Sequence, residues 1–192
     1  MGLQQSTPAV ATPQRSIVLE PHVQSSAFFQ AKATGATGMQ WNPTWRLHRD
    51  PQTGFANFTF LASQFKHGLL IGLSNGMSDT AGGVVLHIGG KNYSNNQYSN
   101  GMSSMHNVNQ MTVYNHRPVF DIGQSVHFWV QVQPYKILVG LGTRIGDQLL
   151  LDCKVPDTRV LEFFGFGTNT GDDYIRVIDN VAVVRSIQTI SS

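Results

Sequence analysis

The 192-residue sequence contains a single cysteine, only two glutamates and few charged residues of either sign. Charged residues make up 12% of the chain, against roughly a quarter in an average soluble domain. Glutamate, lysine and alanine favour helices, so their scarcity argues against layers of surface helices. Long windows with apolar residues at three- and four-residue spacing are also missing. We therefore expect neither a helical bundle nor helices packed on a sheet.

The charge balance also limits the class of partner. The formal net charge is +2, and no run of lysines and arginines occurs. Nucleic-acid binding needs clustered cationic side chains that contact phosphates, so we expect no nucleic-acid partner. Low surface charge instead favours a protein partner or a homo-oligomer, with exposed sheet edges as the contact.

The only cysteine, Cys153, excludes an intrachain disulfide. It lies in a predicted strand, where a free cysteine is typically a small buried residue. A nucleophilic role would need a paired histidine, which sequence alone does not show. The lack of disulfides fits an intracellular protein on the cytosolic side, and we find no secretory signal peptide.

The sequence predicts no metal site, no cofactor and no catalytic residues. None of the seven histidines stands at metal-ligand spacing. Asp147, Asp172 and Asp173 are too few carboxylates for calcium, which takes six to eight oxygen ligands. Glycine-rich segments precede predicted strands rather than helices, which excludes a phosphate cradle at a helix N-terminus. No serine, histidine and aspartate arrangement stands out for acid–base chemistry, so we expect a protein that is not an enzyme.

The chain does contain many short apolar runs separated by glycine turns. Phe55–Phe60 alternates, with Ala56, Phe58 and Phe60 on one face. Residues 125–133 alternate as well, with Trp129 on the face opposite the aliphatic side chains. Strands are predicted at residues 16–20, 27–32, 55–60, 68–74, 82–88, 110–115, 125–133, 135–140, 148–153, 160–166 and 174–185. The pattern indicates an all-β fold, an antiparallel two-sheet β-sandwich of the jelly-roll or lectin-like kind, as one domain over residues 16–192.

Residues 1–15 form a predicted flexible tail, rich in serine, threonine and proline. Gly2 follows the initial methionine and Ser6 stands four residues later, which is the N-myristoylation pattern. One myristoyl chain gives only weak membrane attachment, and neither a cysteine nor a basic cluster follows. We expect peripheral membrane association through Gly2, with the second attachment supplied by a partner or by the folded domain.

Residues 91–110 are predicted to form a long loop rich in asparagine and serine, and loops of that length are often functional. Carboxamides can both donate to and accept from sugar hydroxyls, while tyrosine rings offer flat apolar faces. Met102 and Met105 suit an adaptable protein contact, and a solvated loop without a ligand is the alternative. The predicted ligand-binding residues of this loop are Asn92, Tyr93, Asn95, Asn96 and Tyr98.

Trp129 is the sixth predicted binding residue. It shares a strand face with His127 and Gln131. If that face is open to solvent, the indole offers an exposed aromatic surface for a ligand; if it is covered, Trp129 contributes to packing. The sequence leaves both alternatives open.

Several glycine–aromatic motifs resemble the domain family named after farnesoic acid O-methyltransferase. The resemblance covers residues 55–184 and rests on Phe58–Ser63, Leu70–Ser74, Leu86–Gly90 with Asn92 and Ser94, Phe128–Val130, Ile137–Gly142 and Phe164–Thr168. It implies a lectin-like sandwich that occurs as an accessory module. The family name implies methyl transfer from S-adenosylmethionine, but the strand-to-helix glycine fingerprint of a dinucleotide-type site is missing here. The asparagine-rich insertion after Gly90 departs from the family pattern.

Three functional hypotheses follow from the sequence. The first is a non-catalytic binding or scaffold module, lipid-tethered through Gly2 and part of a larger protein assembly. The second is a lectin-like module that binds carbohydrate through loop 91–110. The third, with least support from the residues, is a methyltransferase of the kind that the family name implies.

Overall fold

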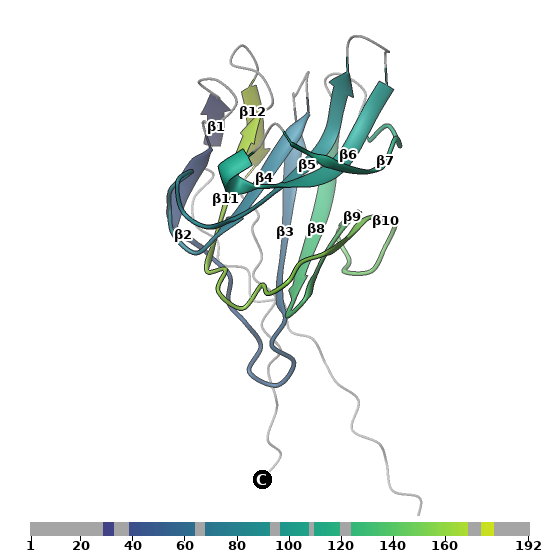
Figure 1. Ribbon diagram of the computed structural model, residues 1–192. Helices are drawn as coiled ribbons and strands as arrows, with labels where there is room; N and C mark the ends of the chain where they lie inside the picture. The colour runs from purple at the N-terminus through teal and green to yellow at the C-terminus, as the bar shows by residue number, and fades with distance from the viewer. Residues whose placement is uncertain are drawn as a thin grey trace, which may run out of the picture.

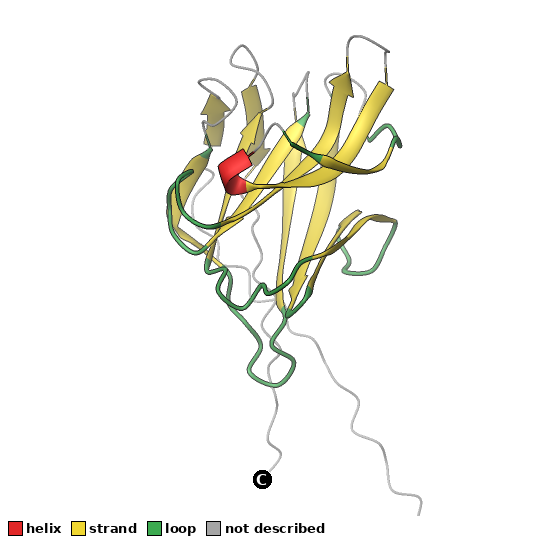
Figure 2. Ribbon diagram, viewed as in Figure 1, coloured by secondary structure: helices red, strands yellow, loops and turns green. Residues whose placement is uncertain are grey.

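The computed structural model describes residues 29–32, 39–63, 68–92, 97–107, 110–119, 124–168 and 174–178, with the backbone alone at 29–32, 63, 90–92, 97 and 174–178. These ranges contain twelve β-strands and one short 3-10 helix, η1 (Met105–Asn107). Figure 2 shows that strands account for almost all of the regular structure. The predicted tail with Gly2 and the predicted strand at 16–20 lie outside the described residues.

The strands form two six-stranded sheets, which Figure 1 shows as two layers. Sheet A has the order β1 (Phe29–Lys32), β12 (Tyr174–Ile178), β3 (Ala56–Ser63), β8 (Ser125–Gln133), β9 (Lys136–Leu141) and β10 (Leu149–Lys154). Sheet B has the order β2 (Gln40–Arg46), β11 (Phe163–Thr168), β4 (Leu69–Ser74), β5 (Gly83–Asn92), β6 (Gln97–Ser104) and β7 (Thr112–Asn115). Every neighbouring pair is antiparallel. The predicted antiparallel two-sheet β-sandwich is confirmed.

Aromatic side chains fill the space between the sheets. Phe58 of β3 stacks on Phe164 of β11 with ring centroids 4.1 Å apart, and Phe60 stacks on Phe128 of β8 at 5.2 Å. These rings are almost completely buried, as the alternation of residues 55–60 and 125–133 predicted. Burying each ring contributes roughly 1.5–3 kcal/mol. The same alternation sends Asn57 and Gln131 to the outer side of sheet A.

Cys153 lies in this core with its side chain fully buried. Burial raises the pKa of the thiol from 9.0 to about 12, although a hydrogen bond with Tyr114 acts in the opposite direction. A protonated, buried thiol is a poor nucleophile. The interpretation of Cys153 as a small packing residue is confirmed.

The predicted loop at residues 91–110 is wrong, because most of this segment is strand β6 followed by η1. Asn100 explains the error, since it is a polar residue at a fully buried position of β6. Its Oδ1 accepts from the Gly89 N–H at 2.7 Å, and its Nδ2 donates to Asn115 Oδ1 and to the Arg117 carbonyl, both at 2.7 Å. These bonds satisfy the amide and hold the β5–β6–β7 side of sheet B together. Residues 97–101 show no apolar alternation that would have predicted this strand.

Candidate functional site

Few of the residues predicted from the 91–110 segment can be placed. Tyr93, Asn95 and Asn96 lie outside the described residues, and Asn92 ends β5 with only its backbone described. Tyr98 is partly exposed on β6, opposite Lys91 of β5, and its carbonyl lies 3.1 Å from His116 Nδ1. The pairing of β5 with β6 brings the Asn92 and Tyr98 positions to one end of this hairpin. Their part in binding stays a prediction.

Trp129 lies on the outer side of β8 but is only 1% exposed. Its Nε1–H donates to the Asp147 carbonyl at 2.6 Å, so the β9–β10 loop folds back towards the indole. A Cβ on Gly140, the partner of Trp129 on β9, would overlap the indole ring. The exposed-aromatic alternative for Trp129 is therefore wrong, because Gly140 on the neighbouring strand leaves room for the indole and the β9–β10 loop lies over it.

Beyond Trp129, towards the β8–β9 turn, the outer side of sheet A carries mostly polar, partly exposed side chains. The register of the strands places its outward-facing residues in two rows across β3, β8, β9 and β10. The first row is Asn57, Gln131, Leu138 and Asp152, and the second is Gln133, Lys136 and Lys154. Adjacent strands are about 4.8 Å apart, so each row spans about 10–14 Å of surface.

Three carboxamides of these rows form one hydrogen-bonded chain, which we call the amide line: Asn57, Gln131 and Gln133. Gln131 Nε2 donates to Asn57 Oδ1 at 3.0 Å, and Gln133 Nε2 donates to Gln131 Oε1 at 2.7 Å. All three side chains are partly exposed. Within the described part of the chain, Asn57 Nδ2 and Gln133 Oε1 have no partner. The amide line therefore presents a free donor at one end and a free acceptor at the other.

The β9–β10 half of the same surface is charged. Lys136 Nζ lies 2.8 Å from Asp152 Oδ2, and the two side chains are 37% and 44% exposed. Lys154 is exposed directly opposite Lys136 and has no ion pair among the described residues. The two rows thus carry neutral amides on β3 and β8, charges on β9 and β10, and the partly exposed Leu138 between them.

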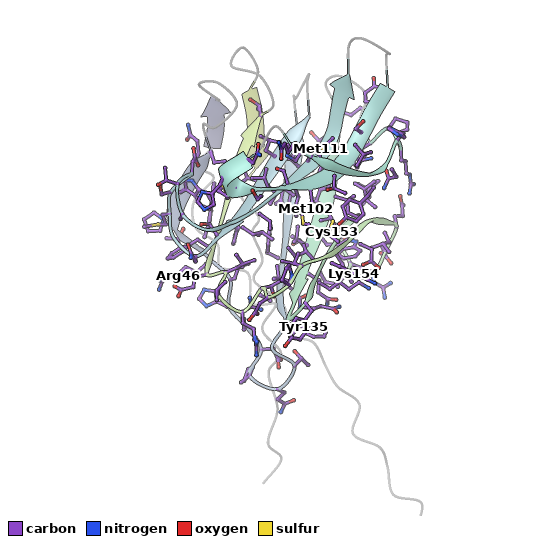
Figure 3. All side chains as sticks on the ribbon, viewed as in Figure 1. Arg46, Met102, Met111, Tyr135, Cys153 and Lys154 are labelled. Atoms are coloured by element: carbon purple, nitrogen blue, oxygen red, sulfur yellow. The ribbon has the colours of Figure 1, made fainter. Side chains whose placement is uncertain are left out.

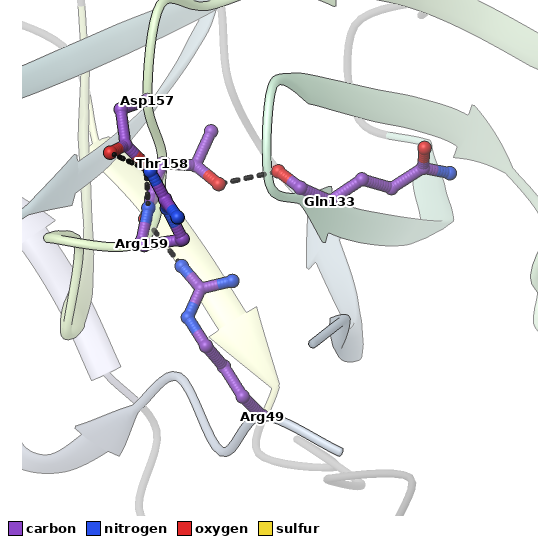
Figure 4. Close-up of polar contacts among 5 residues, drawn as sticks. All are labelled: Arg49, Gln133, Asp157, Thr158 and Arg159. Carbon is purple, nitrogen blue, oxygen red and sulfur yellow. Dashed lines mark hydrogen bonds and ion pairs between the residues drawn. The ribbon is translucent and has the colours of Figure 1, made fainter. Parts of the chain in front are cut away.

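A network at the end of the sandwich fixes the backbone at Gln133 (Figure 4). The Thr158 hydroxyl, which is fully buried, donates to the Gln133 carbonyl, and Thr158 N donates to the Pro134 carbonyl at 2.9 Å. The Arg49 guanidinium donates in turn to the Thr158 carbonyl and to the Gly54 carbonyl at 3.0 Å. Burial lowers the pKa of Arg49, while attraction to Asp157 raises it. These contacts tie the turn between β8 and β9 to the rest of the sandwich.

Arg159 closes this network on the solvent side. Its guanidinium donates to both oxygens of Asp157, from Nε to Oδ1 at 3.0 Å and from Nη2 to Oδ2 at 2.9 Å. The hydrogen bonds from Arg159 lower the pKa of the Asp157 carboxyl to about 2. The charge of Arg159 is therefore already paired and is not available to a ligand on sheet A.

On the outer side of sheet B, one tryptophan, Trp41, lies over glycines of β4 and β11. Trp41 Nε1 donates to Asp79 Oδ1 at 2.8 Å, and Met39 N donates to Asp79 Oδ2 at 3.1 Å, so both carboxylate oxygens have a partner. A Cβ on Gly165 would lie 2.9 Å from Trp41 Cε3, and one on Gly72 would lie 3.0 Å from Cη2. The indole therefore lies flat on bare backbone, and Asp79 holds it there.

Metal and membrane features are missing from the described ranges. They contain no group of three or more histidine, cysteine, aspartate or glutamate side chains that could hold a metal ion. Nor do they contain a helix with the length and hydropathy needed to cross a bilayer.

Sequence reasoning did not single out the amide line. The alternation of residues 125–133 does place Gln131 and Gln133 on the face opposite the core residues. The alternation does not predict that Asn57 lies beside Gln131, because the two residues are 74 positions apart and meet only through the register of β3 with β8. The polar phase of an otherwise apolar strand is the signal that points to this surface.

No family model matches this chain, and no curated protein does. Solved structures similar to it include a galectin of Caenorhabditis elegans, with 11% identity, a TM-score of 0.43 and coverage of 76% of this chain and 94% of the galectin. A carbohydrate-binding module of Bacillus subtilis has 16% identity and a TM-score of 0.42, covering 76% and 94%. An alginate lyase mutant in complex with an alginate tetrasaccharide has 12% identity and a TM-score of 0.43, covering 71% of each chain. Similarity at this level carries no inference about a ligand of this chain.

Proposed function

We propose that this chain is a non-catalytic carbohydrate-binding module and that its ligand lies on the outer side of sheet A, along the amide line. The observation that carries the proposal is the hydrogen-bonded chain of three partly exposed carboxamides with unpaired groups at both ends. A carboxamide offers both donors and an acceptor, and a sugar hydroxyl is both donor and acceptor. The amide line can therefore continue into the hydroxyl groups of a sugar without a change of charge.

The arrangement also reduces the cost of binding. Ordering a flexible side chain at an interface costs about 0.5–1.5 kcal/mol. Gln131 and Gln133 are already restrained by their mutual hydrogen bond, and the Gln133 backbone is held by Thr158. Leu138 adds a partly exposed apolar surface beside the amides, which suits the C–H side of a sugar ring.

The same surface favours binding over hydrolysis. Most glycosidases use a pair of carboxylates on either side of the bond that they cleave. The two rows on sheet A hold one carboxylate, Asp152, and it is paired with Lys136. A sugar bound here would meet hydrogen-bonding groups and a cation, but no acid–base pair.

The other hypotheses from the sequence stay predictions. The lipid-tethered scaffold rests on Gly2, outside the described residues, and mass spectrometry of the N-terminal peptide tests it. Self-association would be tested by sedimentation, and a protein partner by identifying co-purifying proteins. Methyl transfer rests on the family resemblance alone, and calorimetry with S-adenosylmethionine tests it.

A glycan array followed by calorimetry tests the proposed function. We expect the wild-type chain to bind a subset of glycans and Gln131→Ala to weaken that binding about tenfold, because it removes the centre of the amide line. Gln40→Ala, which changes a partly exposed glutamine on β2 of sheet B, serves as the matched control and should leave binding unchanged. An array without signal, or equal affinities for Gln131→Ala and wild type, would overturn the proposal.

A further inference from the structure

Two lysines stand face to face at the edge of the proposed sugar surface. The register pairs Lys136 of β9 with Lys154 of β10, and both side chains project from the outer side of sheet A. Like charges directly opposite each other in a sheet are destabilising. Without a ligand, Asp152 reduces the repulsion between the two lysines, because its carboxylate lies 2.8 Å from Lys136 Nζ and neutralises that charge.

The second lysine has no such partner. Lys154 is exposed and makes no ion pair within the described ranges. The two rows on sheet A contain two cations and one anion, which leaves a net positive charge at Lys154. By contrast, Arg159 is bound by Asp157 through Nε and Nη2, and Arg49 is bound by backbone carbonyls.

The unpaired charge lies within reach of the amide line. Gln133, Lys136 and Lys154 follow one another across β8, β9 and β10, so Gln133 and Lys154 are two strand spacings apart, about 10 Å. A ligand whose hydroxyls meet Gln133 can therefore place a negative group at Lys154 if it is longer than one sugar ring. Lysine presents a compact charge with three donors, which suits a single carboxylate.

We propose that the ligand is an acidic oligosaccharide built from uronic-acid units, with neutral hydroxyls along the amide line and a carboxylate at Lys154. This inference rests on the proposed function and names the substrate class of the same site. With this carboxylate bound, each of the two lysines has an anion beside it: Asp152 for Lys136 and the ligand for Lys154.

The test compares acids with their neutral esters. Calorimetry would use tetrasaccharides of galacturonate, mannuronate and guluronate, each next to its methyl ester, which keeps the skeleton and removes the charge. We expect at least one acid to bind about tenfold more tightly than its ester at low salt, and the advantage to shrink at high salt because the pair is exposed. Lys154→Gln should remove the advantage and leave binding of the ester unchanged.

Arg46→Gln is the matched control, because it removes one exposed charge from sheet B, well away from Lys154 (Figure 3). It should change no affinity by more than about twofold. Equal affinities for acid and ester, or an acid preference that survives Lys154→Gln, would overturn the inference while glycan binding itself persisted. If neither the tetrasaccharides nor any glycan on the array bound, the proposed function would fail as well.

Discussion

The outer faces of the two sheets are built differently, although each carries a tryptophan that lies flat on glycine. On sheet B, Trp41 lies over Gly72 and Gly165, and its N–H is bound by Asp79. On sheet A, Trp129 lies over Gly140, and its N–H is bound by the Asp147 carbonyl. Both indoles are therefore parts of the scaffold. The difference lies beside them, where sheet A brings the unpaired end groups of the amide line and the unpaired Lys154 together on one surface.

Under the proposed function, this difference makes aromatic content a poor guide to the binding face. A tryptophan whose N–H is satisfied and whose ring covers bare backbone stabilises the sheet beneath it. The amide line differs from such a tryptophan, because its members hydrogen-bond one another and still present unpaired groups to solvent. The following changes test whether the two faces divide in this way.

The largest effect is expected from the core that both faces share. The Cys153 thiol has a pKa near 12 in the folded protein and near 9.0 when unfolded. Between these values the unfolded chain binds fewer protons, so stability should fall as pH rises, by on the order of 1 kcal/mol per pH unit. Urea unfolding at pH 8–12 would measure how the free energy of unfolding changes with pH. We expect a shallower fall for Cys153→Val, which has no thiol to titrate. Parallel curves for the two proteins would contradict the buried position of the thiol.

A second change disturbs the scaffold on sheet A. Gly140→Ala adds a Cβ that overlaps the Trp129 ring, and overpacking of this kind costs about 1–3 kcal/mol. We expect a loss of about 2 kcal/mol in the free energy of unfolding by urea titration. Adding Trp129→Leu should make the alanine much less costly, since the overlapping ring is gone. Additive losses in the double mutant would show that Trp129 does not occupy the space over Gly140.

A third change compares carboxylates on the two faces. Asp79→Ala leaves the Trp41 and Met39 N–H groups without acceptors, and we expect a loss of about 1–2 kcal/mol. Asp152→Ala on sheet A breaks only an exposed ion pair, which is worth about 0–1 kcal/mol. Thermal unfolding of both variants checks the order. If Asp152→Ala were the more costly, sheet A would not be the open face.

The smallest effect on stability is expected at the amide line itself. Gln131→Ala should change the free energy of unfolding by less than about 0.5 kcal/mol, because the side chain is partly exposed and lies outside the core. Chemical denaturation would show this. A loss above about 2 kcal/mol would mean that the amide line holds the sheet together instead of serving a ligand.

Much of the fold could be predicted because its signals are local. The alternation in residues 55–60 and 125–133 gives both the strands and their buried faces, and glycines mark the turns. Strand β2 was not predicted because Pro43 interrupts its sequence. It is an edge strand of sheet B, where proline is tolerated. β6 escaped because its inward residue Asn100 is satisfied by Asn115 and Arg117, which follow later in the chain.

The candidate site was harder to predict because it depends on register. Sequence shows that Gln131 faces away from the core, but it does not show that Asn57, Leu138 and Lys154 share that surface. It also placed the binding amides in residues 91–110 by composition, whereas the amide line has only three members on two strands. Sequence left the exposed and the packing alternatives for Trp129 open for a similar reason, since the loop that covers the indole comes from the neighbouring hairpin.

The central claim is that sugars bind to sheet A through the amide line. Side-chain amide resonances of a ¹⁵N-labelled sample, followed by NMR during titration with a glycan found on the array, test it most directly. We predict shifts of the Asn57, Gln131 and Gln133 side-chain amides, with the Trp41 indole N–H unchanged. Shifts at Trp41 with these three amides unmoved would place the ligand on sheet B and contradict the account.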